Sequence, residues 1–447
     1  MMVSVPPQNL VSILDAGKAV KRCKSVMENC GFTDIHCEIR ESSVIFSAAE
    51  DATTGQATPQ ATKLIRTTHT DDTYWSFFDG IGDSKTFNSM IGTEIAMLFR
   101  PKVTASKGLY LRGEYSGQQY TAALTCRHLL TTCRDSNINI EPQKESNTMQ
   151  TVQTNMEHGG LSVMQWGAGK LQGIHESNKR FLEDCIRLLD ERKPHQDARI
   201  QQNQALYKSQ AAFLQRISDA PNRVFGTVFL SPSIGPSPRG PGVTNPWLMD
   251  WMLIRLHACR HEEELSQINN TLHLSREQVK MAASRAEDRD FARRLLLTPE
   301  MFERHDFDSR SVQLPLKDII RISEIRNPVP GLAKHGIGPA TLVGKLGPKT
   351  GLTFGYASTF TSVIRTPIGG DTTVTEVWPV ISSARYYFSG DGDSGSCVWG
   401  LDGRVAGIVV AGNRNQLEGD TWHDITYVVP IEAILEDMKR RGFVASV

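Results

Sequence analysis

Residues 392–412, with the sequence GDSGSCVWGLDGRVAGIVVAG, decide how this chain is interpreted, because they place Ser394 between two glycines just ahead of a strand-like segment. In such a tight turn a serine hydroxyl can reach a substrate carbonyl. With no side chain at Gly392, the N–H groups of Gly392 and Ser394 could converge on a developing oxyanion. A Gly/Asp/Ser turn that merely joins two strands would read the same. The motif therefore indicates a nucleophile only if partner residues accompany it.

Two further residues meet the needs of a serine nucleophile. Serine is a weak nucleophile at neutral pH and requires a general base, a task suited to histidine. His128 ends the segment 120–128 (YTAALTCRH), where a strand would leave it facing a cleft. Asp250 lies in the apolar stretch 247–256 (WLMDWMLIRL), where a buried carboxylate needs a partner. Taken alone, His128 could be a structural histidine, and Asp250 a surface acid or an N-cap.

The pattern around these residues predicts a mainly β protein. Short strand-like segments are separated by Gly, Pro and Asn turns, which favours a sandwich or barrel; they are residues 109–112, 120–125, 161–165, 224–230, 251–256, 352–357 and 405–411. Residues 172–220 and 256–303 are charge-rich with apolar residues at helical intervals, which predicts helical insertions. Residues 344–351 (GKLGPKTG) lack the spacing of a phosphate-binding loop and are interpreted as a loop entering the next strand.

The first hundred residues have a different texture. Residues 10–30 carry apolar side chains at helical spacing, and residues 34–47 alternate as a strand does. Residues 48–72 show no period and resemble a linker. We therefore expect a small α+β module in residues 1–100, followed by a β domain in residues 101–447.

Composition narrows the classes of function. The chain has 447 residues, with 49 Lys plus Arg and 49 Asp plus Glu, so no global charge favours nucleic acid or an anionic membrane. Neither a secretory leader nor a membrane-spanning run is evident, and the eight cysteines include no CxxC pair. His257 and His261 are four residues apart, but a surface pair explains them better than a metal site. We expect an intracellular, cytoplasmic protein without metal or cofactor.

Taken together, the order His128, Asp250, Ser394 and the flanking motifs resemble the chymotrypsin-like (trypsin-like) serine proteases. Residues 124–130 (LTCRHLL) look like the intracellular and bacterial branches, and residues 407–412 (GIVVAG) are similar to the strand behind the nucleophile. More loosely, the layout looks like trypsin-like proteins encoded by filamentous fungi. The resemblance implies two antiparallel β-barrels with the active site between them.

The resemblance also implies a role for each residue. His128 would be general base and then acid, Asp250 would fix its tautomer, and Ser394 would form the acyl-enzyme. The N–H groups of Gly392 and Ser394 would form the oxyanion hole. The substrate strand would be lined by Val410, Ala411 and Gly412. The expected activity is that of a serine endopeptidase acting on polypeptides, and the helical insertions could bind a partner protein.

Two departures from the family pattern keep alternatives open. Phe388 stands where trypsins have an aspartate, so a preference for Lys or Arg is not supported. The chain has no Ile-Val-Gly-Gly activation terminus, which leaves Asp393 without the ammonium group that zymogen-activated members use. The site is then either formed without processing or not formed. A catalytically silent binding protein of the same fold and a serine esterase with the same triad are the alternatives.

Overall fold

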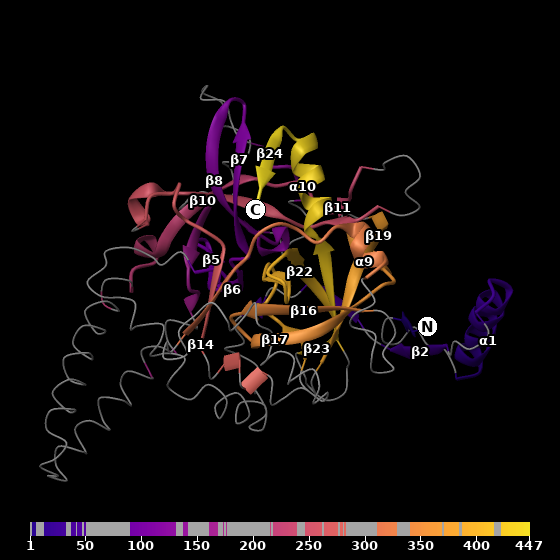
Figure 1. The fold of residues 1–447 in the computed structure, drawn as a ribbon. Coiled ribbons are helices and arrows are strands. Elements are labelled where there is room, and N and C mark those ends of the chain that lie inside the picture. The colour runs from indigo at the N-terminus through magenta and orange to yellow at the C-terminus, as the bar shows by residue number, and fades with distance from the viewer. Residues whose placement is uncertain are drawn as a thin grey trace, which may run out of the picture.

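Two large β-sheets contain most of the strands in the part of the chain that the structure describes (Figure 1). The computed structural model describes residues 2–5, 13–32, 37–41, 43–46, 49–50, 90–130, 137–141, 161–168, 173, 176, 215, 218–238, 246–261, 263–275, 278–279, 281–282, 311–328, 340–368, 371–383, 387–414 and 422–447. Each large sheet has nine strands, and three small two-stranded sheets accompany them. The mainly β class predicted from the sequence is therefore confirmed.

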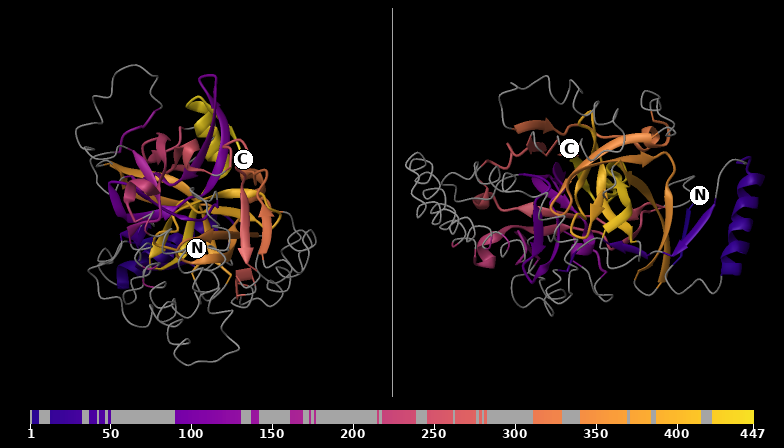
Figure 2. Two further views of the ribbon diagram at one scale, coloured as in Figure 1. Left: turned by 90° about the vertical axis from the view of Figure 1, so that its left-hand side faces the viewer. Right: turned by 90° about the horizontal axis from the view of Figure 1, so that it is seen from below.

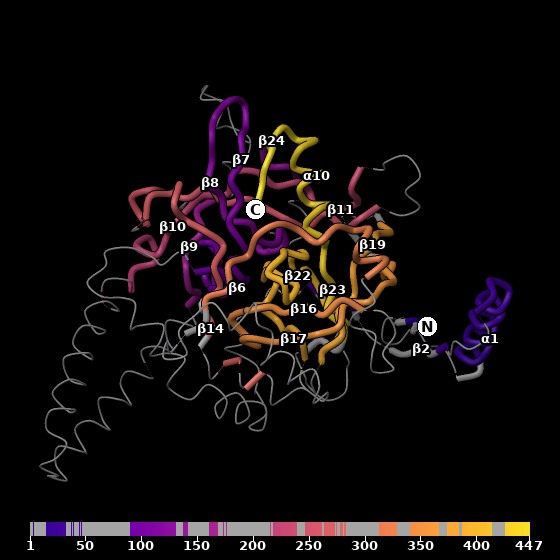
Figure 3. Tube along the Cα trace, in the orientation of Figure 1, coloured from indigo at the N-terminus to yellow at the C-terminus, as the bar shows by residue number. Residues whose placement is uncertain are grey.

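The first sheet contains the strands that lead to His128 and Asp250. Its order is β24 (Phe443–Ser446), β7 (Leu109–Tyr115), β8 (Gln118–Thr125), β13 (Met252–Leu256), β10 (Val224–Leu230), β9 (Ser162–Gln165), β5 (Glu94–Met97), β6 (Arg100–Ser106) and β4 (Ala49–Glu50). The strands β7 and β8 form a hairpin in which Leu109 lies opposite Leu124. The C-terminal strand β24 completes one edge by pairing with β7, as Figure 3 shows.

The second sheet closes into a barrel, and it includes the strands β20 and β21 that flank Ser394. Its order is β18 (Ser362–Ile368), β19 (Asp371–Ser382), β17 (Gly351–Ser358), β16 (Ala340–Gly347), β21 (Cys397–Gly400), β22 (Val405–Arg414), β23 (Trp422–Pro430) and β20 (Ser389–Gly390), and β3 (Ser43–Phe46) pairs with β22. Because β19 pairs with both β17 and β23, the six strands from β19 to β23 form a closed ring.

Three small sheets and several helices accompany the two large sheets. The three small sheets pair β1 (Met2–Val5) with β2 (Glu38–Glu41), β11 (Gly235–Pro236) with β12 (Leu248–Met249), and β14 (Thr271–Ser275) with β15 (Ser311–Pro315). Helices in the described residues include α1 (Ile13–Asn29), α9 (Ile322–Arg326) and α10 (Ile431–Arg440), with 3-10 turns at Arg127–Leu129, Ala220–Arg223 and Ala258–Arg260. Helix α1 lies beyond β2, away from the two large sheets (Figure 2). Within the described residues, no helix is long and apolar enough to cross a membrane.

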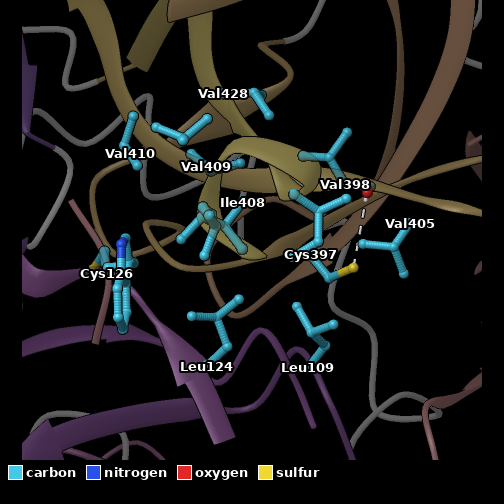
Figure 4. Close-up of a cluster of buried hydrophobic side chains, with 14 of the residues drawn as sticks. Leu109, Leu124, Cys126, Cys397, Val398, Val405, Ile408, Val409, Val410 and Val428 are labelled. Atoms are coloured by element: carbon cyan, nitrogen blue, oxygen red, sulfur yellow. Dashed lines mark hydrogen bonds between the residues drawn. The ribbon is translucent and has the colours of Figure 1, made fainter. Parts of the chain in front are cut away.

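One continuous apolar core joins the two large sheets. Figure 4 shows Ile408, Val409 and Val410 of β22 together with Leu109 and Leu124 of the first sheet, all of them fully buried. The alternation of β7 and β8 supplies the first-sheet side of this contact, because every second side chain of a strand faces the same way. This shared core packs the end of β8, which leads to His128, against β22 of the second sheet.

The strand predictions were confirmed, with two exceptions. All seven predicted segments lie on β7, β8, β9, β10, β13, β17 and β22, and the helix expected at residues 10–30 is α1. The loop expected at residues 344–351 is wrong in its first half, because residues 344–347 are the end of strand β16. The single strand expected at residues 34–47 is two strands with different partners, β2 on β1 and β3 on β22.

The predicted insertions fall mostly outside the described residues. Nearly all of residues 172–220 and residues 283–303 lie there, as do residues 51–89. In the described part of the second insertion, Thr271–Ser275 forms strand β14. How the chain divides into domains stays a prediction.

Candidate active site

His128 and Asp250 meet at the end of the first sheet. His128 lies in the 3-10 turn Arg127–Leu129 that follows β8, and Asp250 lies between β12 and β13, next to the strand that pairs with β8. Nδ1 of His128 is 2.6 Å from Oδ2 of Asp250, and the backbone N–H of His128 donates to Oδ1 at 2.9 Å. Both side chains are buried. One carboxylate therefore fixes both the position of the turn and the orientation of the imidazole.

This pairing sets the protonation of the imidazole. Burial alone lowers the pKa of His128, but the charge of Asp250 and its hydrogen bond outweigh burial and raise the pKa above its ordinary value of 6.5. The other ring nitrogen, Nε2, has no hydrogen-bond partner in the described part of the chain. A nitrogen left in this way can take a proton from a nearby hydroxyl.

Ser394 lies in a turn that only glycine allows. Gly392 has a φ of +99° and Gly395 a φ of +84°, both in the left-handed region. A Cβ on Gly395 would come within 2.2 Å of the Thr125 hydroxyl and 2.5 Å of the Ser106 carbonyl oxygen. The turn therefore packs backbone to backbone against the end of β8. In the described residues, neither the N–H of Gly392 nor that of Ser394 has a hydrogen-bond acceptor, which leaves both free for an oxyanion.

The structure brings Ser394 to the same region without joining it to His128. The backbone N–H of Ser106, at the end of β6, donates to the Ser394 carbonyl at 2.7 Å, so the nucleophile turn is tied to the sheet that carries His128. The Ser394 hydroxyl itself donates to the Val410 carbonyl at 3.4 Å. Across the described residues, it makes no hydrogen bond to His128. Catalytic hydrogen bonds of this kind often form only once substrate is bound.

Asp393 has the cationic partner that its sequence surroundings did not reveal. Nζ of Lys345, on β16, lies 3.3 Å from Oδ2 of Asp393, and both side chains are fully buried. The same carboxylate accepts hydrogen bonds from the N–H groups of Lys349 at 2.9 Å and Gly390 at 3.0 Å, and from the Thr350 hydroxyl at 2.6 Å. The ion pair and hydrogen bonds of Asp393 thus hold the turn before Ser394 without requiring the ammonium group of a free N-terminus.

Lys345 was missed because residues 344–351 were interpreted as a loop. Its signal is nevertheless present in the sequence, since Lys345 interrupts the apolar strand pattern of residues 340–347. A buried lysine in a strand needs a carboxylate. Burial lowers the pKa of Lys345 below its ordinary value of 10.5, and Asp393 opposes that effect.

The strand β22, which was expected to bind substrate, is already paired with β3. Ala411 and Gly412 lie opposite Phe46 and Ile45 of β3 in an antiparallel pairing, while Val410 accepts from the Ser394 hydroxyl. Phe46 also contacts His128, with ring centroids 5.3 Å apart. This contact could not be predicted, because the partner of a four-residue strand cannot be inferred from alternation alone.

A metal site is not part of this arrangement. Among the described residues, no three His, Cys, Asp or Glu side chains are grouped so that they could hold a metal ion. His257, one of the two spaced histidines, has its Nε2 atom 2.7 Å from the Thr227 hydroxyl. His261 is buried rather than at the surface.

Comparisons with known proteins give fold neighbours only. No family model matches the chain, and no curated protein is similar to it in sequence. Among solved structures, a glutamic-acid-specific serine protease has 9% identity and a TM-score of 0.31, over 80% of this chain and 100% of its own. Protease A of Thermobifida fusca has 10% identity and a TM-score of 0.32, over 80% and 98%. The chymotrypsin of Cellulomonas bogoriensis has 10% identity and a TM-score of 0.32, over 81% of this chain and 99% of its own. We therefore base the functional interpretation on the side chains of the site.

Proposed function

We propose that this protein is a serine hydrolase of chymotrypsin type that cleaves peptide bonds through Ser394, His128 and Asp250. The observation that carries this proposal is the buried imidazole of His128, held through Nδ1 by Asp250 with its other nitrogen unpartnered among the described residues. A carboxylate that grips one imidazole nitrogen leaves the other available as a base. The turn carrying Ser394 is tied by hydrogen bonding to the same sheet.

In the proposed reaction, rotation of the Ser394 side chain away from the Val410 carbonyl brings the hydroxyl to Nε2 of His128. His128 takes the proton as Ser394 attacks the substrate carbonyl, and the resulting charge on the carbonyl oxygen is met by the N–H groups of Gly392 and Ser394. His128 then donates the proton to the leaving amine, and water hydrolyses the acyl-enzyme. The first sheet, which carries His128 and Asp250, would form the first barrel of the fold, and the second sheet the second barrel. The substrates would be polypeptides, and no cofactor would be needed.

Labelling with a fluorophosphonate probe tests this proposal, because the probe reports an activated serine without requiring the natural substrate. We expect the wild-type protein to be labelled and both Ser394→Ala and His128→Ala to lose labelling by about four to six orders of magnitude. Ser396→Ala and His257→Ala are matched controls that should keep it. Labelling that persists in Ser394→Ala would rule out this nucleophile.

One observation favours a second candidate, a catalytically silent binding protein. The Ser394 hydroxyl donates to the Val410 carbonyl rather than to His128. A folded wild-type protein that is never labelled, even with β3 displaced from β22, would support that candidate. A serine esterase would instead be labelled, and would hydrolyse ester but not peptide substrates.

A further inference from the structure

The strand β3 occupies the part of β22 that a bound peptide would use. Ser43, Val44, Ile45 and Phe46 lie opposite Arg414, Asn413, Gly412 and Ala411 in an antiparallel register. On their other side, the same residues of β22 pair with β23. Without β3, this stretch of β22 would be an open strand edge, and such edges capture extended peptides.

The direction of β3 leads the chain to Ser394. From Ser43 to Phe46 the strand runs from Arg414 toward Ala411, the neighbour of Val410, and the Val410 carbonyl accepts the Ser394 hydroxyl. Three residues after Phe46, Ala49 pairs with Thr104 of β6, a strand of the first sheet.

The strand β6 is itself tied to the nucleophile, because its Ser106 N–H donates to the Ser394 carbonyl. Residues 43–46 and 49–50 therefore pair with two strands that each contact Ser394, one from each large sheet. A peptide positioned for cleavage has to be held in this way, on both sides of the bond that is attacked.

Phe46 also covers the proposed base. Its ring lies 5.3 Å from the His128 ring, tilted by 46°, and the Phe46 side chain is half-buried. The side chain that ends β3 therefore occupies space beside the imidazole of His128.

We propose that residues 43–46, together with residues 49–50, are an intramolecular ligand of the expected substrate-binding edge of β22 at residues 411–414, here called the substrate groove, and that they hold the protein in a latent state until they are displaced. This inference rests on the proposed function for its effect on activity, but not for the placement of the segment. A tethered peptide acts at an effective concentration in the millimolar range, so even a weak strand pairing keeps the groove filled. Incoming polypeptides then compete with the chain's own strand.

A substitution in β3 tests the latency. Phe46→Asp places a charge beside His128 and Ala411, and we expect it to raise the rate of fluorophosphonate labelling by at least about tenfold over the wild-type protein, as release of a mostly occupied site would. Phe32→Asp is the matched control, since Phe32 is exposed and outside the groove, and it should label at the wild-type rate. Equal rates for Phe46→Asp and the wild-type protein would overturn the latency.

A disulfide lock tests the placement without requiring catalysis. Val44 and Asn413 lie directly opposite each other, so Val44→Cys with Asn413→Cys should cross-link on oxidation, also in the Ser394→Ala background. Each single cysteine variant is the control, and peptide mapping identifies the bond. Failure of the pair to cross-link in folded protein would overturn the placement.

The two experiments together separate this inference from the proposed function. With an active serine, oxidation of the double variant should stop labelling and reduction should restore it. If the pair cross-links in folded protein but neither the reduced form nor Phe46→Asp is ever labelled, the placement of β3 stands and the proposed hydrolase activity fails.

Discussion

Asp250 and Asp393 are two fully buried carboxylates that contribute to the proposed site in different ways. Asp250 holds His128, whose imidazole can bind and release a proton. Asp393 holds the Lys345 ammonium and three backbone or hydroxyl donors around it. The comparison shows that burial of a carboxylate does not by itself mark a catalytic group, because the partner decides whether the pair moves protons or fixes the backbone.

The largest expected effect comes from Asp250→Asn. It keeps the shape of the side chain but holds the wrong imidazole tautomer, so we expect fluorophosphonate labelling to fall by about 10⁴-fold, by analogy with triad aspartates. Asp402→Asn, at an exposed carboxylate paired with Arg404, is the control. Unchanged labelling of Asp250→Asn would mean that Asp250, like Asp393, only fixes structure.

Lys345→Met should act mainly on stability. It leaves the Asp393 carboxylate buried without its cation, and we expect the free energy of unfolding to fall by about 3–5 kcal/mol in denaturant titrations. Lys349→Met is the control, since Lys349 contributes its backbone N–H to Asp393. Adding Asp393→Asn to Lys345→Met should recover part of the loss. No recovery would show that the ion pair is not what holds the turn.

A smaller loss is expected at a third buried carboxylate, Asp437 of α10. It accepts from the Trp251 indole and the Arg441 guanidinium, both at 3.1 Å, and Trp251 is the neighbour of Asp250. Asp437→Asn should lower the free energy of unfolding by about 1–3 kcal/mol while the folded protein labels at the normal rate. Exposed Glu436→Gln is the control. A large loss of labelling would show that α10 positions Asp250.

The two ion pairs should also respond to pH with opposite signs. Because the folded-state pKa of His128 is raised above 6.5, its pair stabilises the protein fully below pH 6.5, and this stability is lost as pH rises through the folded pKa. The folded-state pKa of Lys345 is lowered below 10.5, so the unfolded chain binds more protons there and stability rises with pH toward 10.5. Each slope is limited to about 1.4 kcal/mol per pH unit.

Thermal unfolding across pH measures both slopes. His128→Gln should remove the part of the stability that falls as pH rises. Lys345→Met should remove the part of the stability that increases with pH. His257→Gln, whose imidazole does not contact Asp250, should leave both in place. Identical pH profiles for wild type and His128→Gln would contradict the charged state assigned to the pair.

The sequence predicted most strands and the residues of the proposed site because each has a local signal. Val224–Leu230 is an apolar run of strand length, and Ser394 and Asp250 were singled out by their order along the chain with His128 rather than by either motif alone. What it could not predict depends on pairing between distant segments. Lys345 was hidden in a stretch rich in Gly and Pro, and the partner of β3 depends on a groove built by residues more than three hundred positions later.

The pairing of β24 with β7 has a consequence for biosynthesis. Tyr115, near the hairpin that leads to His128, cannot gain its partner Phe443 until that residue has left the ribosome. The sheet that orients the imidazole is therefore completed only after Phe443 has been made, whereas Ser43–Phe46, which pairs with β22, is made before β22 itself. Under the proposed function, the nascent chain would thus carry its own ligand for β22 before the sheet that orients His128 is complete.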